Sequence, residues 1–200
     1  MQKARIAIVY HSGAGHAKAV AEHMALSMDE EHVRVVLASV EDDNIIDELH
    51  AADTIVFGCP TYFGNVSAGF KAFMEHTGQF WYRQPWRDKL AAGFTCSSTV
   101  NGDKLNTLMS LALFAAQHGM IWISQGILPR YMNDQQTDGQ NRMGSFLGLM
   151  TQCDNSRVQV DPLNPGDSLT IELFARRILD LTISLRHPLS PEMAAQKDHL

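Results

Sequence analysis

Three short segments of the 200-residue chain gather the hydroxyl, amide and glycine residues that suit a phosphate or a flat polar ligand. The first runs from Ser12 to Ala17, the second from Pro60 to Asn65 and the third from Ser97 to Gly102. Backbone N–H groups in small-residue turns approach anions closely, and a helix N-terminus adds partial positive charge. We therefore predict a phosphate-binding site that includes the first segment.

The first segment departs from the common nucleotide-binding fingerprints. Its sequence, Ser-Gly-Ala-Gly-His-Ala, is neither G-x-G-x-x-G nor G-x-x-x-x-G-K-[ST]. Ser12 offers a hydroxyl donor, and His11 or His16 offers another. Taken alone, the segment is equally consistent with an ordinary strand-to-helix turn that binds nothing.

Each polar segment follows a predicted strand. Apolar runs predict strands, and helical periodicity lies between them. The strands are expected over 6–9, 33–38, 54–58, 90–95 and 120–123, and the helices over 15–28, 42–49, 67–76 and 103–118. Strands that alternate with helices favour a parallel α/β sheet, in which ligands bind beyond the carboxyl ends of the strands. We therefore expect the three segments to converge on one site.

Residues 125–166 form a long segment of weak periodicity before the last predicted helix. Long segments of this kind are usually functional or disordered, and we favour an ordered insertion near the site. Asp167 or Ser168 is expected to cap the last helix. The chain is therefore predicted to hold one domain over 1–188, followed by a mobile tail over 189–200.

Composition excludes several classes of protein. Hydrophobic residues make up 45% of the chain and charged residues 19%, which indicates a globular fold. The net charge is −6 and lysine and arginine do not cluster, so no nucleic-acid partner is expected. The longest apolar run, 111–116, is too short to span a membrane. No signal peptide is recognised, which predicts the cytoplasm.

Cysteine and histidine spacing indicates neither a disulfide framework nor a metal site. Cys59, Cys96 and Cys153 form no C-x-x-C motif and are widely separated. We expect them to be small buried hydrophobes, with oxidation as the less favoured alternative. The nine histidines show no metal-ligand spacing, so no metal is predicted.

The second polar segment and the helix after it resemble the WrbA-type NAD(P)H:quinone oxidoreductases, which are flavodoxin-like proteins. Residues 60–67, Pro-Thr-Tyr-Phe-Gly-Asn-Val-Ser, resemble the family's P-T-R-F-G-N-x-x segment, and 71–81 resemble its helix and tryptophan loop. Residues 117–120, Gln-His-Gly-Met, are similar to its His-His-Gly-Met. The resemblance covers 4–124 and implies an α/β three-layer sandwich around a five-stranded parallel sheet of order 2-1-3-4-5.

The resemblance also implies an FMN cofactor, NAD(P)H as co-substrate and a quinone-like acceptor. It assigns the phosphate to the first segment, an edge of the flavin ring to the second, and the ribityl and pyrimidine side to the third. The cofactor-binding residues are then Ser12, Gly13, Ala14, Gly15, His16, Ala17, Pro60, Thr61, Tyr62, Phe63, Gly64, Asn65, Ser97, Ser98, Thr99, Val100, Asn101, Gly102 and His118. The resemblance also places Trp81 in the slot where the family binds its substrate. A homodimer or homotetramer is implied, in which a neighbouring subunit supplies some contacts.

Several residues depart from the family's pattern. The arginine of the second segment is Tyr62 here, the aromatic residue of the first is Ala14, and the third lacks a glycine-rich run. Residues 141–145 look more like a looser group of flavodoxin-family NAD(P)H dehydrogenases. These departures leave the nicotinamide and the acceptor open. We expect Arg142 to pair with a surface carboxylate rather than with the phosphate of a nicotinamide cofactor.

Two other functions stay open at this point. One is a flavodoxin-type electron carrier without a small-molecule substrate. The other is a non-enzymatic interaction or regulatory protein, because a fold alone does not determine function. Trp81 is equally consistent with a packing or interface residue, and His118 with a helix C-terminal residue that the helix dipole favours.

Overall fold

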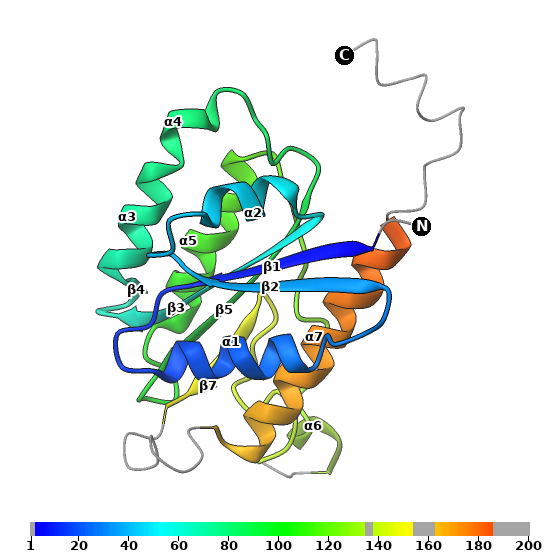
Figure 1. Cartoon of the computed structure of the whole chain (residues 1–200). Helices are drawn as coiled ribbons and strands as arrows, with labels where there is room; N and C mark the ends of the chain where they lie inside the picture. Colours follow the sequence, from blue (N-terminus) through cyan, green and yellow to red (C-terminus); the bar gives the residue numbers. More distant parts are fainter. Residues whose placement is uncertain (1–2, 135–137, 154–162, 186–200) are drawn as a thin grey trace.

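The computed structural model describes residues 3–134, 138–153 and 163–185. A parallel sheet forms its middle layer (Figure 1). The five strands that make up the main path of this sheet are β1 (Ala4–Tyr10), β2 (Val33–Ser39), β3 (Thr54–Tyr62), β5 (Leu90–Ser97) and β6 (Ile121–Trp122). They pair in the order β2-β1-β3-β5-β6, which confirms the predicted order of five parallel strands.

Two further strands correct the predicted count of five. The two-residue strand β4 (Asn65–Val66) pairs antiparallel with β3, and β7 (Leu149–Gln152) pairs parallel with β5. The amino-terminal part of β5 pairs with β6 and its carboxyl-terminal part pairs with β7. Because β6 is so short, β7 supplies the hydrogen-bond partners that the buried end of β5 needs. The insertion therefore completes the sheet beside the carboxyl-terminal end of β5.

Helices cover both faces of the sheet. Their bounds are α1 (His16–Leu26), α2 (Ile45–Ala51), α3 (Ala68–His76), α4 (Gly78–Trp81), α5 (Lys104–Gln117), α6 (Tyr131–Asp134) and α7 (Pro165–Leu185). The helices α1 and α7 pack on one face and bury one apolar cluster, which includes Met24 and Phe174. The helices α2, α3 and α5 pack on the other face over a second cluster around Phe57. The expected three layers are confirmed.

The last helix begins earlier than the sequence indicates. It starts at Pro165, and the Asn164 side-chain oxygen accepts a hydrogen bond from the Gly166 backbone N–H at 2.9 Å. Asp167 is buried and paired with Arg142, so the predicted cap at 167 or 168 is wrong. The predicted end of the domain at 188 and the tail over 189–200 lie outside the described residues.

No helix of the described part is long and apolar enough to cross a membrane.

Candidate functional site

The first polar segment connects β1 to α1 and presents free backbone donors. The Ser12 hydroxyl oxygen accepts hydrogen bonds from the N–H groups of Gly15, at 3.1 Å, and Lys18, at 3.2 Å. Gly15 has φ of +92°, a left-handed conformation that side chains disfavour. The backbone N–H groups of Gly13, Ala14, His16 and Ala17 donate no hydrogen bond to any described residue. These donors surround the N-terminus of α1 and favour an anion.

His16 adds an unsatisfied polar atom to the same segment. Its side chain is buried, and its Nε2 atom has no hydrogen-bond partner among the described residues. Buried polar atoms are nearly always satisfied, so a group that is absent from the chain itself is expected to bind there. The first segment therefore has the composition and the free donors of an anion site.

The second polar segment is a tight hairpin rather than the predicted loop. The strand β3 continues to Tyr62 and pairs back with β4 through Phe63 and Gly64, whose φ values are +49° and +71°. Two consecutive positive φ values are typical of the turns that join short hairpins. A bulky residue at positive φ is strained, and the Phe63 side chain is fully exposed. Strain of this kind is found preferentially at functional sites.

The hairpin is anchored to the core and to α5. The Thr61 hydroxyl is buried and hydrogen-bonded to the hydroxyl oxygens of Thr95, at 2.7 Å, and Thr107, at 2.8 Å. Asn106 donates from its side-chain nitrogen to the Gly64 carbonyl oxygen at 2.6 Å. Because the Thr61 hydroxyl is committed, the hairpin offers a ligand mainly its backbone and the aromatic rings of residues 62 and 63.

The third polar segment is hydrogen-bonded to a buried lysine, Lys104, which was not among the predicted site residues. Lys104 is fully buried at the start of α5, and its Nζ atom donates to the Ser97 hydroxyl oxygen at 2.9 Å. The same Nζ atom donates to the carbonyl oxygens of Thr99, at 2.7 Å, and Val100, at 2.8 Å. Burial lowers the pKa of this lysine. The three hydrogen bonds of Lys104 fix the conformation of the segment.

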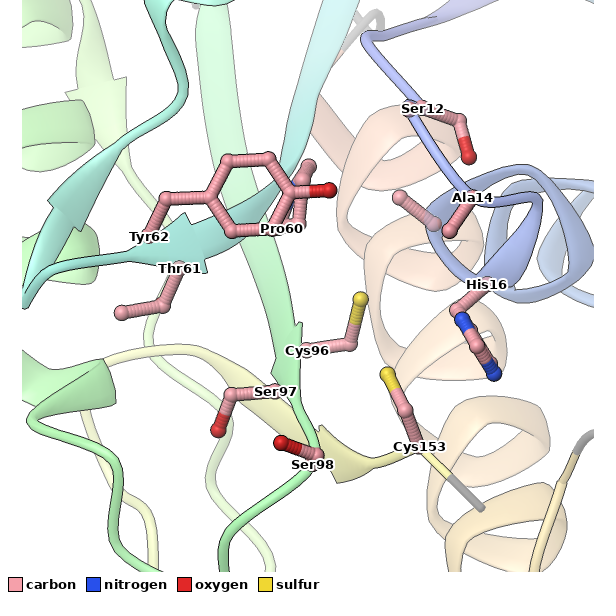
Figure 2. Close-up of a pocket in the computed structure, with 12 residues that line it drawn as sticks. Ser12, Ala14, His16, Pro60, Thr61, Tyr62, Cys96, Ser97, Ser98 and Cys153 are labelled. Atoms are coloured by element: carbon pink, nitrogen blue, oxygen red, sulfur yellow. The ribbon is translucent and has the colours of Figure 1, made fainter. Parts of the chain in front are cut away.

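The three segments meet in one pocket of about 190 Å³ (Figure 2). Its lining residues are Ser12, Gly13, Ala14, His16, Ala17, Pro60, Thr61, Tyr62, Cys96, Ser97, Ser98 and Cys153. We call this the three-loop pocket. Tyr62 points across it, and an ideal Cβ on Gly13 would lie 2.9 Å from the Tyr62 hydroxyl. The structure thus brings together the segments that the sequence predicted to converge.

Besides His118 and Trp81, eight residues of the predicted site are placed by the structure outside the lining of this pocket. They are Gly15, Phe63, Gly64, Asn65, Thr99, Val100, Asn101 and Gly102. All eight belong to the same three segments and lie beside the lining residues in sequence. Their role as ligands stays a prediction.

His118 and Trp81 lie together in a different hollow, of about 200 Å³, among α3, α4 and α5. The Nε2 atom of His118 lies 2.9 Å from the Thr77 hydroxyl, while its buried Nδ1 atom has no partner in the described part of the chain. Burial lowers the pKa of His118 to about 4. The Trp81 indole N–H donates to the Gln117 carbonyl oxygen at 2.7 Å. Within a single chain, neither residue lines the three-loop pocket.

The insertion reaches the pocket through a buried ionic network. Arg142 donates two hydrogen bonds to the Asp167 carboxylate, at 2.7 and 3.0 Å, and both side chains are largely buried. Asp167 also accepts from the Gln152 backbone N–H at 2.8 Å, and the Gln152 side chain donates to the Ser98 carbonyl oxygen at 2.9 Å. Arg142 does pair with a carboxylate, but the prediction that this carboxylate lies on the surface is wrong, because Asp167 is buried. This network places β7, and Cys153 directly after it, beside the third segment.

No group of three or more histidine, cysteine, aspartate or glutamate side chains is placed to hold a metal within residues 3–134, 138–153 and 163–185.

Comparisons with known proteins agree with this geometry. A family model described as NADPH-dependent FMN reductase matches residues 38–131. Flavodoxin FldP of Pseudomonas aeruginosa is 35% identical over 176 residues, which cover 86% of this chain and 92% of that protein. Quinone-oxidoreductase QR2 of Triphysaria versicolor is 31% identical, over 78% of this chain and 86% of that protein. An NAD(P)H dehydrogenase (quinone) of Solidesulfovibrio magneticus is 33% identical, over 70% of this chain and 67% of that protein.

Solved structures share the fold. The WrbA-like flavodoxin from Agrobacterium tumefaciens superposes with a TM-score of 0.72 at 31% identity, over 91% of this chain and 99% of that chain. A flavodoxin from the domain Archaea reaches a TM-score of 0.60 at 18% identity, over 90% of this chain and 99% of that chain. The second likeness shows the fold alone.

Proposed function

Because the chain belongs to the flavodoxin-like family of WrbA-type NAD(P)H:quinone oxidoreductases, we propose that it passes electrons from NAD(P)H to a quinone-like acceptor at the three-loop pocket. FMN is its cofactor and NAD(P)H its co-substrate. When bound, FMN would supply the hydride and electron-transfer chemistry between the nicotinamide and the acceptor. The protein has to hold the cofactor, orient it and leave one face open.

The observation that carries this proposal is the set of free donors in the first segment. The N–H groups of Gly13, Ala14, His16 and Ala17 lack acceptors among the described residues, and the Nε2 atom of His16 is buried without a partner. A phosphate has several oxygens that accept hydrogen bonds, and it is favoured at a helix N-terminus. The residues present therefore fit the phosphate end of FMN.

The volume of the pocket fits one part of FMN rather than the whole molecule. Pockets that enclose a drug-sized ligand usually measure about 300–1,000 Å³, whereas the three-loop pocket measures about 190 Å³. The pocket would hold the phosphate and the polar chain, which leaves the flat ring outside it. Tyr62, which lines the pocket, and Phe63, which follows it in the hairpin, are both exposed and offer aromatic faces for stacking.

The third segment would stabilise negative charge on the ring. Lys104 binds the carbonyl oxygens of Thr99 and Val100, so these oxygens already have a hydrogen-bond donor. Preorganised N–H donors in such a loop stabilise developing charge without reorganising. The same anchor keeps the loop from collapsing into the pocket.

We also propose that the protein assembles from identical chains. The helix α5 exposes Leu105, Met109 and Leu113 at four-residue spacing, which places them on one face of the helix. Trp81 is 41% exposed at the hollow beside that helix. Burial of this face against another copy could bring Trp81 and His118 to the pocket of a neighbouring chain. A dimer or tetramer that Leu113→Glu dissociates would support this, and a monomeric protein would contradict it.

The experiment that tests the function is a visible absorption spectrum of the full-length protein with FMN. We expect a flavin spectrum that bleaches when NADPH or NADH is added without oxygen and that recovers when benzoquinone is added. The faster of the two nicotinamides identifies the preferred co-substrate. A protein that retains no FMN at micromolar concentration would contradict the proposal.

A flavodoxin-type electron carrier is the second candidate, and the 35% identity to Flavodoxin FldP favours it. A carrier exchanges electrons with protein partners and does not turn over NAD(P)H by itself. The same spectrum separates the two functions. A flavin that dithionite bleaches and that neither nicotinamide bleaches would identify the carrier.

A further inference from the structure

Two cysteines that are far apart in the sequence meet on the wall of the three-loop pocket. Cys96 lies near the end of β5, and Cys153 follows directly after β7. Cys96 is in register with Thr151, so Cys153 lies two residues further along the neighbouring strand and on the same face. Both side chains line the pocket, and Figure 2 shows the Cys153 sulfur atom directed toward the Cys96 side chain.

The surroundings make the two sulfur atoms unequal. Cys153 is the more exposed of the two thiols, because Cys96 is almost completely buried. Interaction with Cys96 and the nearby Lys104 ammonium lower the pKa of the Cys153 thiol, against the opposing effects of burial and of Asp167. Interaction with Cys153 and near-complete burial raise the pKa of Cys96 well above its usual value. Since the thiolate is the reactive form, we expect Cys153 to be the nucleophile and Cys96 its partner.

Both sulfur atoms are reachable from the pocket. Cys96 and Cys153 belong to the pocket lining, and Cys153 is only partly buried. The third cysteine, Cys59, differs in lying away from the pocket. It is fully buried, it does not line the pocket, and burial raises its pKa to about 12. Cys59 therefore provides an internal control.

We propose that Cys96 and Cys153 form a peroxide-sensitive thiol pair that closes a disulfide on the wall of the three-loop pocket. The Cys153 thiolate attacks one oxygen of hydrogen peroxide, so that an S–O bond forms, the O–O bond breaks and the departing hydroxide takes a proton to become water. The Cys96 thiol then attacks the Cys153 sulfur. An S–S bond forms, the S–O bond breaks, and the oxygen leaves as a second water. Two thiols are oxidised and one peroxide is reduced.

Closing this disulfide is expected to shift the end of β7. A disulfide fixes its two Cα atoms about 4.4–6.8 Å apart and fixes the dihedral angle at the S–S bond, whereas Cys96 and Cys153 are offset by two residues on neighbouring strands. Cys153 lies just outside β7 and is held to β5 by one hydrogen bond, from its N–H to the Ser97 carbonyl oxygen at 2.8 Å. Drawing Cys153 toward Cys96 would strain that bond and shift the third segment. Oxidation is therefore expected to weaken ligand binding in the pocket.

The test is intact mass spectrometry of the full-length protein after treatment with stoichiometric hydrogen peroxide, without reductant. We expect the wild type to lose two hydrogen atoms and to recover them with dithiothreitol, and Cys59→Ala to behave in the same way. Cys153→Ser should form no disulfide. Cys96→Ser should stop at the Cys153 sulfenic acid, which dimedone traps.

A second readout tests the coupling to the pocket and rests on the proposed function. Oxidised wild type should bind FMN about tenfold more weakly than the reduced protein, while oxidant should leave the FMN affinity of Cys153→Ser unchanged. The thiol pair is refuted if the wild type forms no disulfide or if the disulfide persists in Cys153→Ser. An FMN affinity that oxidation does not change refutes the coupling. The mass readout needs no flavin, so failure of FMN binding and failure of the pair are distinguishable.

Discussion

Replacement of Lys104 by methionine tests whether a buried ammonium organises the third segment of the pocket. Lys104 is fully buried, and its Nζ atom donates three hydrogen bonds to the Ser97–Val100 turn, at 2.7 to 2.9 Å. Methionine retains most of the aliphatic volume and removes the charge and all three donors. The change therefore tests the anchor rather than the packing of α5.

The magnitude follows from two opposing contributions. Hydrogen bonds from a charged donor are each worth about 1.5–3 kcal/mol. Removal of a buried ammonium recovers part of its desolvation cost, which amounts to several kcal/mol. Thr99 and Val100 are exposed, so water can replace the lost donors at their carbonyl oxygens. The net loss is therefore about 1–3 kcal/mol, which corresponds to an FMN affinity about 5- to 150-fold weaker if the loop holds the flavin.

The assay is a titration of FMN fluorescence with the full-length protein, alongside a thermal melt of each variant. Lys71→Met is the matched control, because the Lys71 side chain is exposed and, among the described residues, forms its ion pair with Glu75 on its own helix. The control should bind FMN as the wild type does. If Lys104→Met folds and binds FMN within twofold of the wild type, the anchoring role of Lys104 is wrong.

Two further predictions concern the core of the protein. Gly58→Ala should lower the free energy of unfolding, measured in urea, by about 1–3 kcal/mol. The reason is that an ideal Cβ at this position would lie 1.9 Å from the Phe94 ring. Gly78→Ala should lower the free energy of unfolding far less, because a Cβ there meets nothing within 4 Å. The pKa of His118 is about 4 in the folded protein and near 6.5 in the unfolded chain. As the pH is lowered from about 6.5 toward 4, the unfolded chain therefore binds the proton first, and the stability of the wild type should fall. Urea unfolding at about pH 7 and pH 5 should show that His118→Gln lacks most of this loss, which amounts to about 1.4 kcal/mol per pKa unit; equal losses in both proteins would contradict it.

Local patterns in the sequence were sufficient to predict where the pocket lies. Apolar runs located the strands, and parallel strands place their carboxyl ends at one edge of a sheet. The segments that begin at Ser12, Pro60 and Ser97 therefore had to lie near one another, as they do. The phosphate segment was predicted from small residues between a strand and a helix, which is a local signal.

The parts that were missed depend on pairings between distant residues. The strand β7 is four residues long and lies within a weakly periodic segment, so only its pairing with β5 defines it. The buried partnership of Arg142 with Asp167, and the meeting of Cys96 with Cys153, both depend on that pairing. The role of Lys104 was hidden because a lysine at the start of an apolar helix usually faces solvent.

The placement of His118 and Trp81 shows the limit of family resemblance within one chain. Both residues match the family's motif, yet the structure places them in the hollow between α3, α4 and α5. A contact with flavin would then require a second copy of the chain. The oligomeric state in solution therefore decides whether the predicted contacts can form.

Binding of FMN by the Gly15 variants tests the phosphate assignment most directly. Gly15 precedes α1 with φ of +92°, and a Cβ there would meet nothing within 4 Å. Gly15→Ala therefore introduces only backbone strain, of about 1–2 kcal/mol. Gly15→Asp adds the same strain and a negative charge. At a separation of about 6 Å, that charge repels each phosphate charge by about 0.7 kcal/mol in water and by about 3 kcal/mol at an effective dielectric constant of 20.

We would measure the FMN dissociation constant of wild type, Gly15→Ala and Gly15→Asp by fluorescence titration. If the first segment holds the phosphate, Gly15→Asp should bind FMN at least about tenfold more weakly than Gly15→Ala, and the difference should shrink at high salt. Equal dissociation constants for the two variants would mean that the phosphate lies elsewhere.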